Sequence, residues 1–212
     1  MTTILSLCRD DPDGIVRTAD EASRVFASGG VVLYPTDTVY GIGARATDAG
    51  LVDRVRAVKG KDIHSPLIML ASDLTMVERY AHVPSLMRDM RAALPTAPLT
   101  FILDALDALP WVTASDGSVS FRIPGDLWCR SVIQQLGVPI TSTSANVHGC
   151  VQEVTVDGML RQFGVASTQI DLAVDGGPLR TPVPSTIIDV RGDRAVIVRD
   201  GSMPRDLLAM FL

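Results

Sequence analysis

Apolar and polar positions along the chain follow two periods, one typical of helices and one of strands. Segments with apolar residues every three or four positions predict helices, and short apolar runs between them predict strands. The predicted helices cover residues 18–28, 48–60, 74–81, 84–94, 126–136, 156–163 and 204–212. The predicted strands cover residues 31–34, 66–71, 99–103, 118–123, 138–141, 171–174, 185–190 and 194–198. Helices and strands are interspersed, which predicts the α/β class with a mixed sheet.

Residue types at the helix ends support these boundaries. Thr18 and Glu21 have the spacing of a capping box, so we expect the first helix to begin at Thr18. Asp48 is suited to cap the second helix and Gly60 to end it. Because no internal repeat, low-complexity segment or linker interrupts the chain, we expect a single domain over residues 1–212.

Composition narrows the class of protein. Of the 212 residues, 47% are hydrophobic and 20% charged, which is ordinary for a globular domain. The apolar runs are far shorter than the roughly 20 residues that cross a bilayer, and the start of the chain lacks a secretion signal. We therefore expect a cytoplasmic protein with no membrane anchor. The formal charge of −5 disfavours nucleic-acid binding over the whole surface, although it leaves a local basic pocket open.

The sequence lacks the motifs of several common binding and catalytic sites. The histidines and cysteines are widely spaced, so we expect neither a metal site nor a disulfide framework; these residues are His64, His82, His148, Cys8, Cys129 and Cys150. The motif GIGARA, residues 41–46, fits G-x-G-x-x-A but does not join a strand directly to a helix, which disfavours a dinucleotide site. Neither a Walker-type phosphate loop nor a G-x-S-x-G elbow occurs.

Polar side chains follow several of the predicted strands. In open α/β sheets, ligands bind where loops from different strand ends converge, so such residues would line a polar cleft if they lie on one side. The polar strand ends are Thr36 and Thr38, residues 142–146, Ser185 with Thr186, and Arg199.

Lys59 and Lys61 flank the end of the second predicted helix. Their two ammonium groups could clamp neighbouring phosphates, with Ser65 donating a further hydrogen bond. Lysines are also common in the last turn of a helix because they complement its negative end, and the residues alone leave both interpretations open.

Arg122 and the segment STSANVHG, residues 142–149, also have two interpretations. Arg122 lies in an alternating strand with Ser118 and Ser120 on its face, and it needs either a substrate anion or a salt bridge to an acidic side chain. The hydroxyls and amide of the segment 142–149 could bind a carboxylate, ribose or phosphate, or they could simply build a turn.

Seven motifs in order make the chain resemble a known family. They are YPTDTVYGIG, KGKDIHSPLIML, PLTFIL, SFRIP, STSAN, PSTIID and VRDG, and the resemblance covers about residues 18–201. Together they resemble the YrdC/TsaC/YciO family, which includes the threonylcarbamoyl-AMP synthases. The resemblance implies a single YrdC-like α/β domain, with a twisted, largely antiparallel mixed sheet and flanking helices around a deep, positively charged cavity.

The resemblance also implies an activity and its partners. Family synthases convert ATP, L-threonine and bicarbonate to L-threonylcarbamoyl-AMP and pyrophosphate, with Mg²⁺ expected on the ATP. Separate transferase proteins then use the adenylate to modify the adenosine at position 37 of tRNA, and binding of tRNA or double-stranded RNA is a further implied property.

Positions in the motifs imply roles for individual residues. The resemblance makes Lys59 and Lys61 the catalytic lysines and implies no protein-bound metal. It assigns L-threonine to Thr38, Arg122, Ser144 and Ser185, and the nucleotide to Lys61, Ser65, Ser118, Asn146 and Arg199.

The chain departs from the family pattern at a few positions. Lys61 replaces an arginine of the K-x-R pair, which loses a planar two-pronged donor, and Leu70 stands where many members have histidine. Three alternatives therefore accompany the synthase hypothesis: a YciO-like paralogue without synthase activity, an RNA-binding module of this fold, and an enzyme that adenylates another carbamoyl substrate.

Overall fold

The computed structural model describes residues 2–62, 65–179 and 182–212. His64 lies outside the described residues. The strands are β1 Thr3–Ser6, β2 Val32–Tyr34, β3 Gly41–Gly43, β4 Ile68–Leu70, β5 Leu99–Asp104, β6 Ser118–Arg122, β7 Ile140–Ser144, β8 Leu172–Asp175, β9 Thr186–Asp189 and β10 Val196–Arg199. The helices are α1 Pro12–Ala27, α2 Ala49–Lys59, α3 Leu74–Glu78, α4 Ser85–Ala93, α5 Leu127–Leu136 and α6 Val156–Phe163, with 3₁₀ helices η1 Gly164–Gln169 and η2 Arg205–Leu208.

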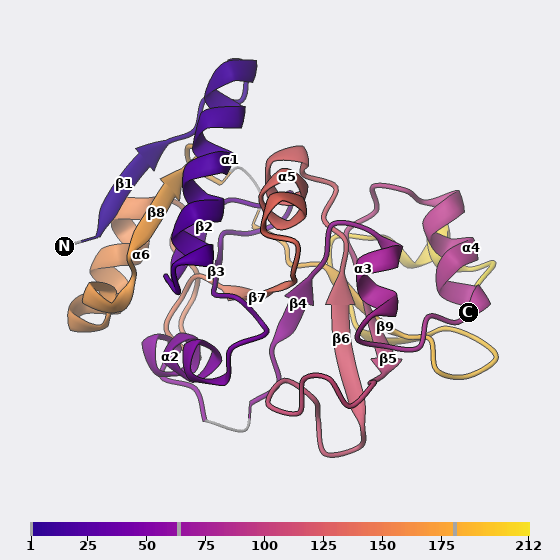
Figure 1. Ribbon diagram of the computed structural model, residues 1–212. Helices are drawn as coiled ribbons and strands as arrows, with labels where there is room; N and C mark the ends of the chain where they lie inside the picture. Colours follow the sequence, from indigo (N-terminus) through magenta and orange to yellow (C-terminus); the bar gives the residue numbers. More distant parts are fainter. Residues whose placement is uncertain (1, 63–64, 180–181) are drawn as a thin grey trace.

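The described strands form one mixed sheet in the order β1-β8-β2-β3-β7-β4-β6-β5-β9-β10. Figure 1 shows β1 and β8 at one end of the sheet and β5 and β9 at the other. The pairs β2–β3, β3–β7, β4–β7, β5–β6 and β9–β10 are antiparallel, and the pairs β1–β8, β2–β8, β4–β6 and β5–β9 are parallel. The prediction of an α/β domain with a mixed sheet is confirmed.

Two helices begin and end as their sequence signals predict. The side chain of Asp48 accepts a hydrogen bond from the backbone N–H of Leu51, and Gly60 ends α2 in the left-handed region with φ of 63°. Asp126 caps α5 in the same manner and Gly137 ends it, with φ of 73°. The C-cap at Gly60 makes Lys59 the last residue of α2.

The predicted ends of two helices were wrong. Helix α1 begins at Pro12, six residues before Thr18, because Pro12 occupies the first helical turn, where its missing N–H costs nothing. The Thr18 hydroxyl donates to the carbonyl of Gly14 inside the helix and caps nothing. The predicted terminal helix over 204–212 is only the 3₁₀ turn η2.

Two short strands were not predicted, and one extends further than expected. Strands β1 and β3 lie in segments that the apolar pattern left unassigned. Strand β7 continues through Ser144, so three of its polar residues belong to the sheet and not to a loop.

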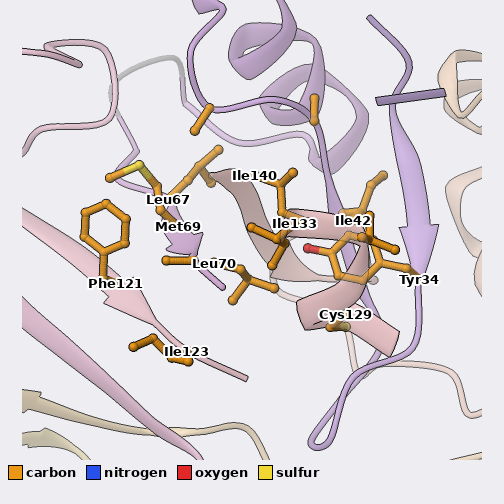
Figure 2. Packing of buried hydrophobic residues seen from close by; sticks show 14 of the residues in the cluster. Tyr34, Ile42, Leu67, Met69, Leu70, Phe121, Ile123, Cys129, Ile133 and Ile140 are labelled. Carbon is orange, nitrogen blue, oxygen red and sulfur yellow. The ribbon is translucent and has the colours of Figure 1, made fainter. Parts of the chain in front are cut away.

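The core packs helix α5 against the centre of the sheet. Figure 2 shows Cys129 and Ile133 of α5 beside Tyr34, Ile42 and Ile140, all of them buried. No described helix is both long and apolar enough to cross a membrane. The packed helix and sheet form the frame on which the polar strand ends are held.

Candidate functional site

Part of one face of the sheet is open at its centre. Ser142, Ile68 and Ser120 are cross-strand partners in a row over β7, β4 and β6, and all three are half-buried. Side chains alternate between the two faces of a strand, and the neighbours of these residues in the next row are fully buried, namely Thr141, Met69 and Phe121. The open rows carry hydroxyls and an arginine where the opposite face carries apolar core.

Two adjoining cavities lie on this open face. The first, which we name the arginine cavity, has a volume of about 60 Å³ and includes Arg122 and Arg199. The second, the lysine cavity, has a volume of about 210 Å³ and includes Lys61. Both are lined by Ile68, Ser142, Thr143 and Ser144, so they adjoin along this wall, and we name the two together the trough.

Arg122 is the buried cation of the arginine cavity, with only 5% of its surface exposed. One terminal nitrogen donates to Thr38 Oγ1 over 2.7 Å and the other donates to Asp37 Oδ1 over 2.5 Å. Its Nε is buried without a partner among the described residues. A buried N–H is costly to leave unpaired, and solvent does not reach this atom, so it adds to the free-energy cost of burying the arginine.

The salt-bridge interpretation of Arg122 is confirmed, since Asp37 is its partner, whereas the interpretation as a substrate anion site stays a prediction. The second carboxylate oxygen of Asp37 accepts from the backbone N–H of Gly125 over 3.2 Å, which ties the loop after β6 to the loop after β2. Asp37 lies inside the motif YPTDTVYG, but the sequence analysis did not single it out. The available signal was an acidic residue between two threonines in this loop, because a plain turn does not require such side chains.

Ser185 and Arg199 complete the arginine cavity. The Ser185 hydroxyl is 2.8 Å from Thr100 Oγ1, and the Ser185 carbonyl accepts from Arg199 over 2.7 Å. Burial and the positive charge of Arg122 both lower the pKa of Arg199. Two guanidinium groups thus face one small space, which favours a ligand with negative charge.

Lys59 lies behind the shared wall of the two cavities, with 1% of its surface exposed, and it lines neither of them. Its Nζ donates to the Ser144 carbonyl and, over 2.9 Å, to Asn146 Oδ1. Burial, and secondarily the charge of Lys61, lower the pKa of Lys59 to about 7. Lys61 lines the lysine cavity, and burial followed by the charge of Arg56 lowers its pKa.

Three of the residues predicted to face the nucleotide do not line the trough, namely Ser65, Ser118 and Asn146. Ser118 lies at the start of β6, where its backbone N–H donates to Asp116. Ser120, two residues further on the same face, is the serine of β6 that lines the lysine cavity. The Ser65 carbonyl accepts from Arg56 over 3.0 Å, and Ser65 flanks the cavity lining next to Pro66.

A larger cavity of about 610 Å³ lies beside the trough. Thr36 and Thr38 line both this cavity and the arginine cavity, but no other predicted site residue reaches it. No group of three or more His, Cys, Asp or Glu side chains in the described part of the chain could hold a metal ion. Six of the ten predicted site residues therefore line the trough, and of these only Thr38 also lines the larger cavity.

Comparison with known proteins shows which family this chain resembles. A family model described as Sua5_yciO_yrdC, "Telomere recombination", matches residues 24–201. The threonylcarbamoyl-AMP synthase of Pyrococcus abyssi is 30% identical over 185 residues, which is 86% of this chain and 54% of that protein. The protein YciO of Escherichia coli K12 is 26% identical over 187 residues, 87% of this chain and 89% of that protein. A protein of Methanocaldococcus jannaschii is 32% identical over 187 residues, 88% of this chain and 86% of that protein.

Solved structures agree with these relatives. The structure of P. abyssi Sua5 complexed with L-threonine superposes with a TM-score of 0.87 at 27% identity and covers all of this chain. The chain spans only 61% of the length of that protein. The structure of E. coli YciO superposes over its whole length with a TM-score of 0.85 at 24% identity, which shows a shared fold. From the matched model and these relatives, we conclude that the chain belongs to the Sua5/YciO/YrdC family.

Proposed function

We propose that the protein is an L-threonylcarbamoyl-AMP synthase, which joins L-threonine, bicarbonate and the AMP part of ATP and releases pyrophosphate. The observation that carries this proposal is the pair of adjoining cavities in the trough, with two arginines lining one and a lysine lining the other. The likeness to Sua5 complexed with L-threonine supports it. The product would serve the threonylcarbamoyl modification of adenosine 37 in tRNA.

L-threonine would occupy the arginine cavity. Its carboxylate would accept from the guanidinium of Arg122, which lines this cavity, while the Thr38 and Ser185 hydroxyls border the same space. A carboxylate held by a fixed guanidinium is oriented as well as bound. The amine would then lie toward the shared wall at Ser144.

ATP, entering with Mg²⁺ on its phosphates, would occupy the lysine cavity. Lys61 would neutralise charge on the phosphates, and Ile68 and Ile187 offer apolar surface to the base. At the shared wall the carbamate oxygen of threonine would attack the α-phosphate. Catalysis would come from holding the two reactants together and from stabilising the charge on the departing pyrophosphate.

The test is direct. The purified protein is incubated with ATP, L-threonine and bicarbonate, and the adenylate is sought by mass spectrometry. Thr38→Val should weaken threonine binding because it removes a hydroxyl of the cavity, whereas Thr168→Val, at an exposed threonine of η1, should not. A product with the lower mass of unsubstituted carbamoyl-AMP would indicate that the enzyme uses another carbamoyl substrate instead.

A second candidate is a YciO-like member that lacks synthase activity. The observation in its favour is Lys61, which presents one ammonium where a two-pronged arginine is expected, together with the similarity to YciO. Restoration of adenylate synthesis in Lys61→Arg, from an inactive native protein, would support this candidate. An active native protein would rule it out.

A further inference from the structure

The hydrogen bonds of the Lys59 amine leave one direction in which it could exchange a proton. The Nζ atom has three partners: the Ser144 carbonyl oxygen, Asn146 Oδ1 at 2.9 Å and the Ser144 hydroxyl at 3.4 Å. The Asn146 amide nitrogen donates to the carbonyls of Val147 and Cys150, which fixes Oδ1 toward the lysine. Two partners are therefore carbonyl oxygens that only accept, and the third is a hydroxyl that can also donate.

This arrangement satisfies both protonation states of the amine. A charged amine has three N–H groups for three acceptors. A neutral amine has two N–H groups for the two carbonyl oxygens, and its lone pair then faces the Ser144 hydroxyl. A buried lysine in a salt bridge would have no such freedom, because only its charged form would be satisfied.

Ser144 connects this amine to the trough. It lines both cavities, whereas Lys59 lines neither. Its hydroxyl is 2.5 Å from Asn146 Oδ1 and 3.4 Å from Lys59 Nζ, so rotation of the hydroxyl redirects its proton from the amide to the amine. Long hydrogen bonds of this kind commonly shorten when substrates bind.

The proposed reaction requires a proton acceptor at this position. Threonine carries an ammonium group near pH 7, and only the neutral amine has a lone pair that attacks bicarbonate. We propose, on the basis of the function proposed above, that Lys59 accepts this proton through the Ser144 hydroxyl. The ammonium gives a proton to Ser144 Oγ as the hydroxyl proton passes to Lys59 Nζ, so that Thr–NH₃⁺ and Lys–NH₂ become Thr–NH₂ and Lys–NH₃⁺. The free amine and HCO₃⁻ then form the carbamate and water.

The charged surroundings agree with this role. Lys61 and burial disfavour the charged form of Lys59, and the Cys150 thiol favours it. The resulting pKa of about 7 leaves a large fraction of Lys59 neutral at neutral pH. Lys59 does not touch the substrate, and it acts only through Ser144.

The test uses Lys59→Arg and Ser144→Ala in the full chain. Arginine keeps the charge and the donors but is not deprotonated in proteins, and alanine removes only the relaying hydroxyl. We expect each variant to lose about 100-fold in kcat at about pH 7, the size of a general-base contribution. In Lys59→Arg, threonine affinity measured by calorimetry should stay within about threefold, because Lys59 lines neither cavity. Ser28→Ala, at an exposed serine that ends α1, is the matched control and should behave as the native protein.

Alkaline bicarbonate separates proton transfer from a structural role. At about pH 9.5 the amine of threonine is largely neutral and forms its carbamate in solution, so both variants should regain most of the native rate. Native-like activity of Lys59→Arg at neutral pH would overturn the proposal, and so would a loss in both variants that alkaline bicarbonate does not restore. If Lys59→Arg does not fold, Ser144→Ala alone decides between these outcomes. Absence of adenylate from the native protein would instead refute the proposed function, before any variant is compared.

Discussion

Replacing Lys59 by methionine should remove a large part of the pH dependence of stability. Burial lowers the pKa of Lys59 to about 7 in the folded protein, compared with 10.5 for an exposed lysine. Between these values the unfolded chain binds a proton that the folded protein does not, so the free energy of unfolding rises with pH. Integrated from pH 7 to about pH 9, this linkage contributes about 2 kcal/mol, because the slope approaches 1.4 kcal/mol per pH unit.

Urea denaturation at these two pH values measures the effect. The free energy of unfolding of the native protein should rise by about 2 kcal/mol more than that of Lys59→Met between about pH 7 and pH 9. The other titratable groups are present in both proteins, so their contributions cancel in the difference. Equal pH dependence in the two proteins would show that folding does not lower the pKa of Lys59. The reasoning from its burial would then be wrong.

Three further substitutions test the arginine cavity. Arg122→Lys should weaken threonine binding at least about tenfold in calorimetry, because an ammonium cannot reproduce the fixed guanidinium; unchanged affinity would move the carboxylate elsewhere. Asp37→Asn should lower the free energy of unfolding by about 3 kcal/mol in urea, since it leaves Arg122 buried without its counter-charge; a change below about 1 kcal/mol would contradict this. Gly201→Ala should cost about 1–3 kcal/mol by the same measurement, because its Cβ would lie 2.4 Å from backbone atoms of Pro184, Ser185 and Thr186; native stability would indicate that this turn moves freely.

The helices with complete end signals were predictable from the sequence. Asp48 and Gly60 define α2 because both ends depend on local backbone geometry. Strand β3 was not predictable, since Gly41 and Gly43 are poor strand formers and are kept there by their neighbours. A Cβ on Gly43 would lie 1.8 Å from the carbonyl oxygen of Thr141, so only glycine allows β7 to pair this closely with β3.

The members of the site were predictable in part, but their arrangement was not. The family motifs pointed to Arg122 and Thr38, yet their contact joins residues 84 positions apart, and no local pattern encodes it. From the sequence, Lys59 and Lys61 were also interpreted as one pair that clamps phosphates. The fold separates them, because Lys59 faces inward to Asn146 and Lys61 faces the cavity. The direction in which a side chain points at a helix end depends on tertiary packing, and the spacing of residues in the sequence does not reveal it.

The central claim is that the trough joins threonine, bicarbonate and ATP in one reaction. Mass spectrometry of the native protein incubated with ATP, ¹³C-bicarbonate and L-threonine tests it most directly. We expect threonylcarbamoyl-AMP that carries the label at its carbamoyl carbon, with an equal amount of pyrophosphate. Pyrophosphate no higher than in a threonine-free control, with no labelled adenylate, would contradict it.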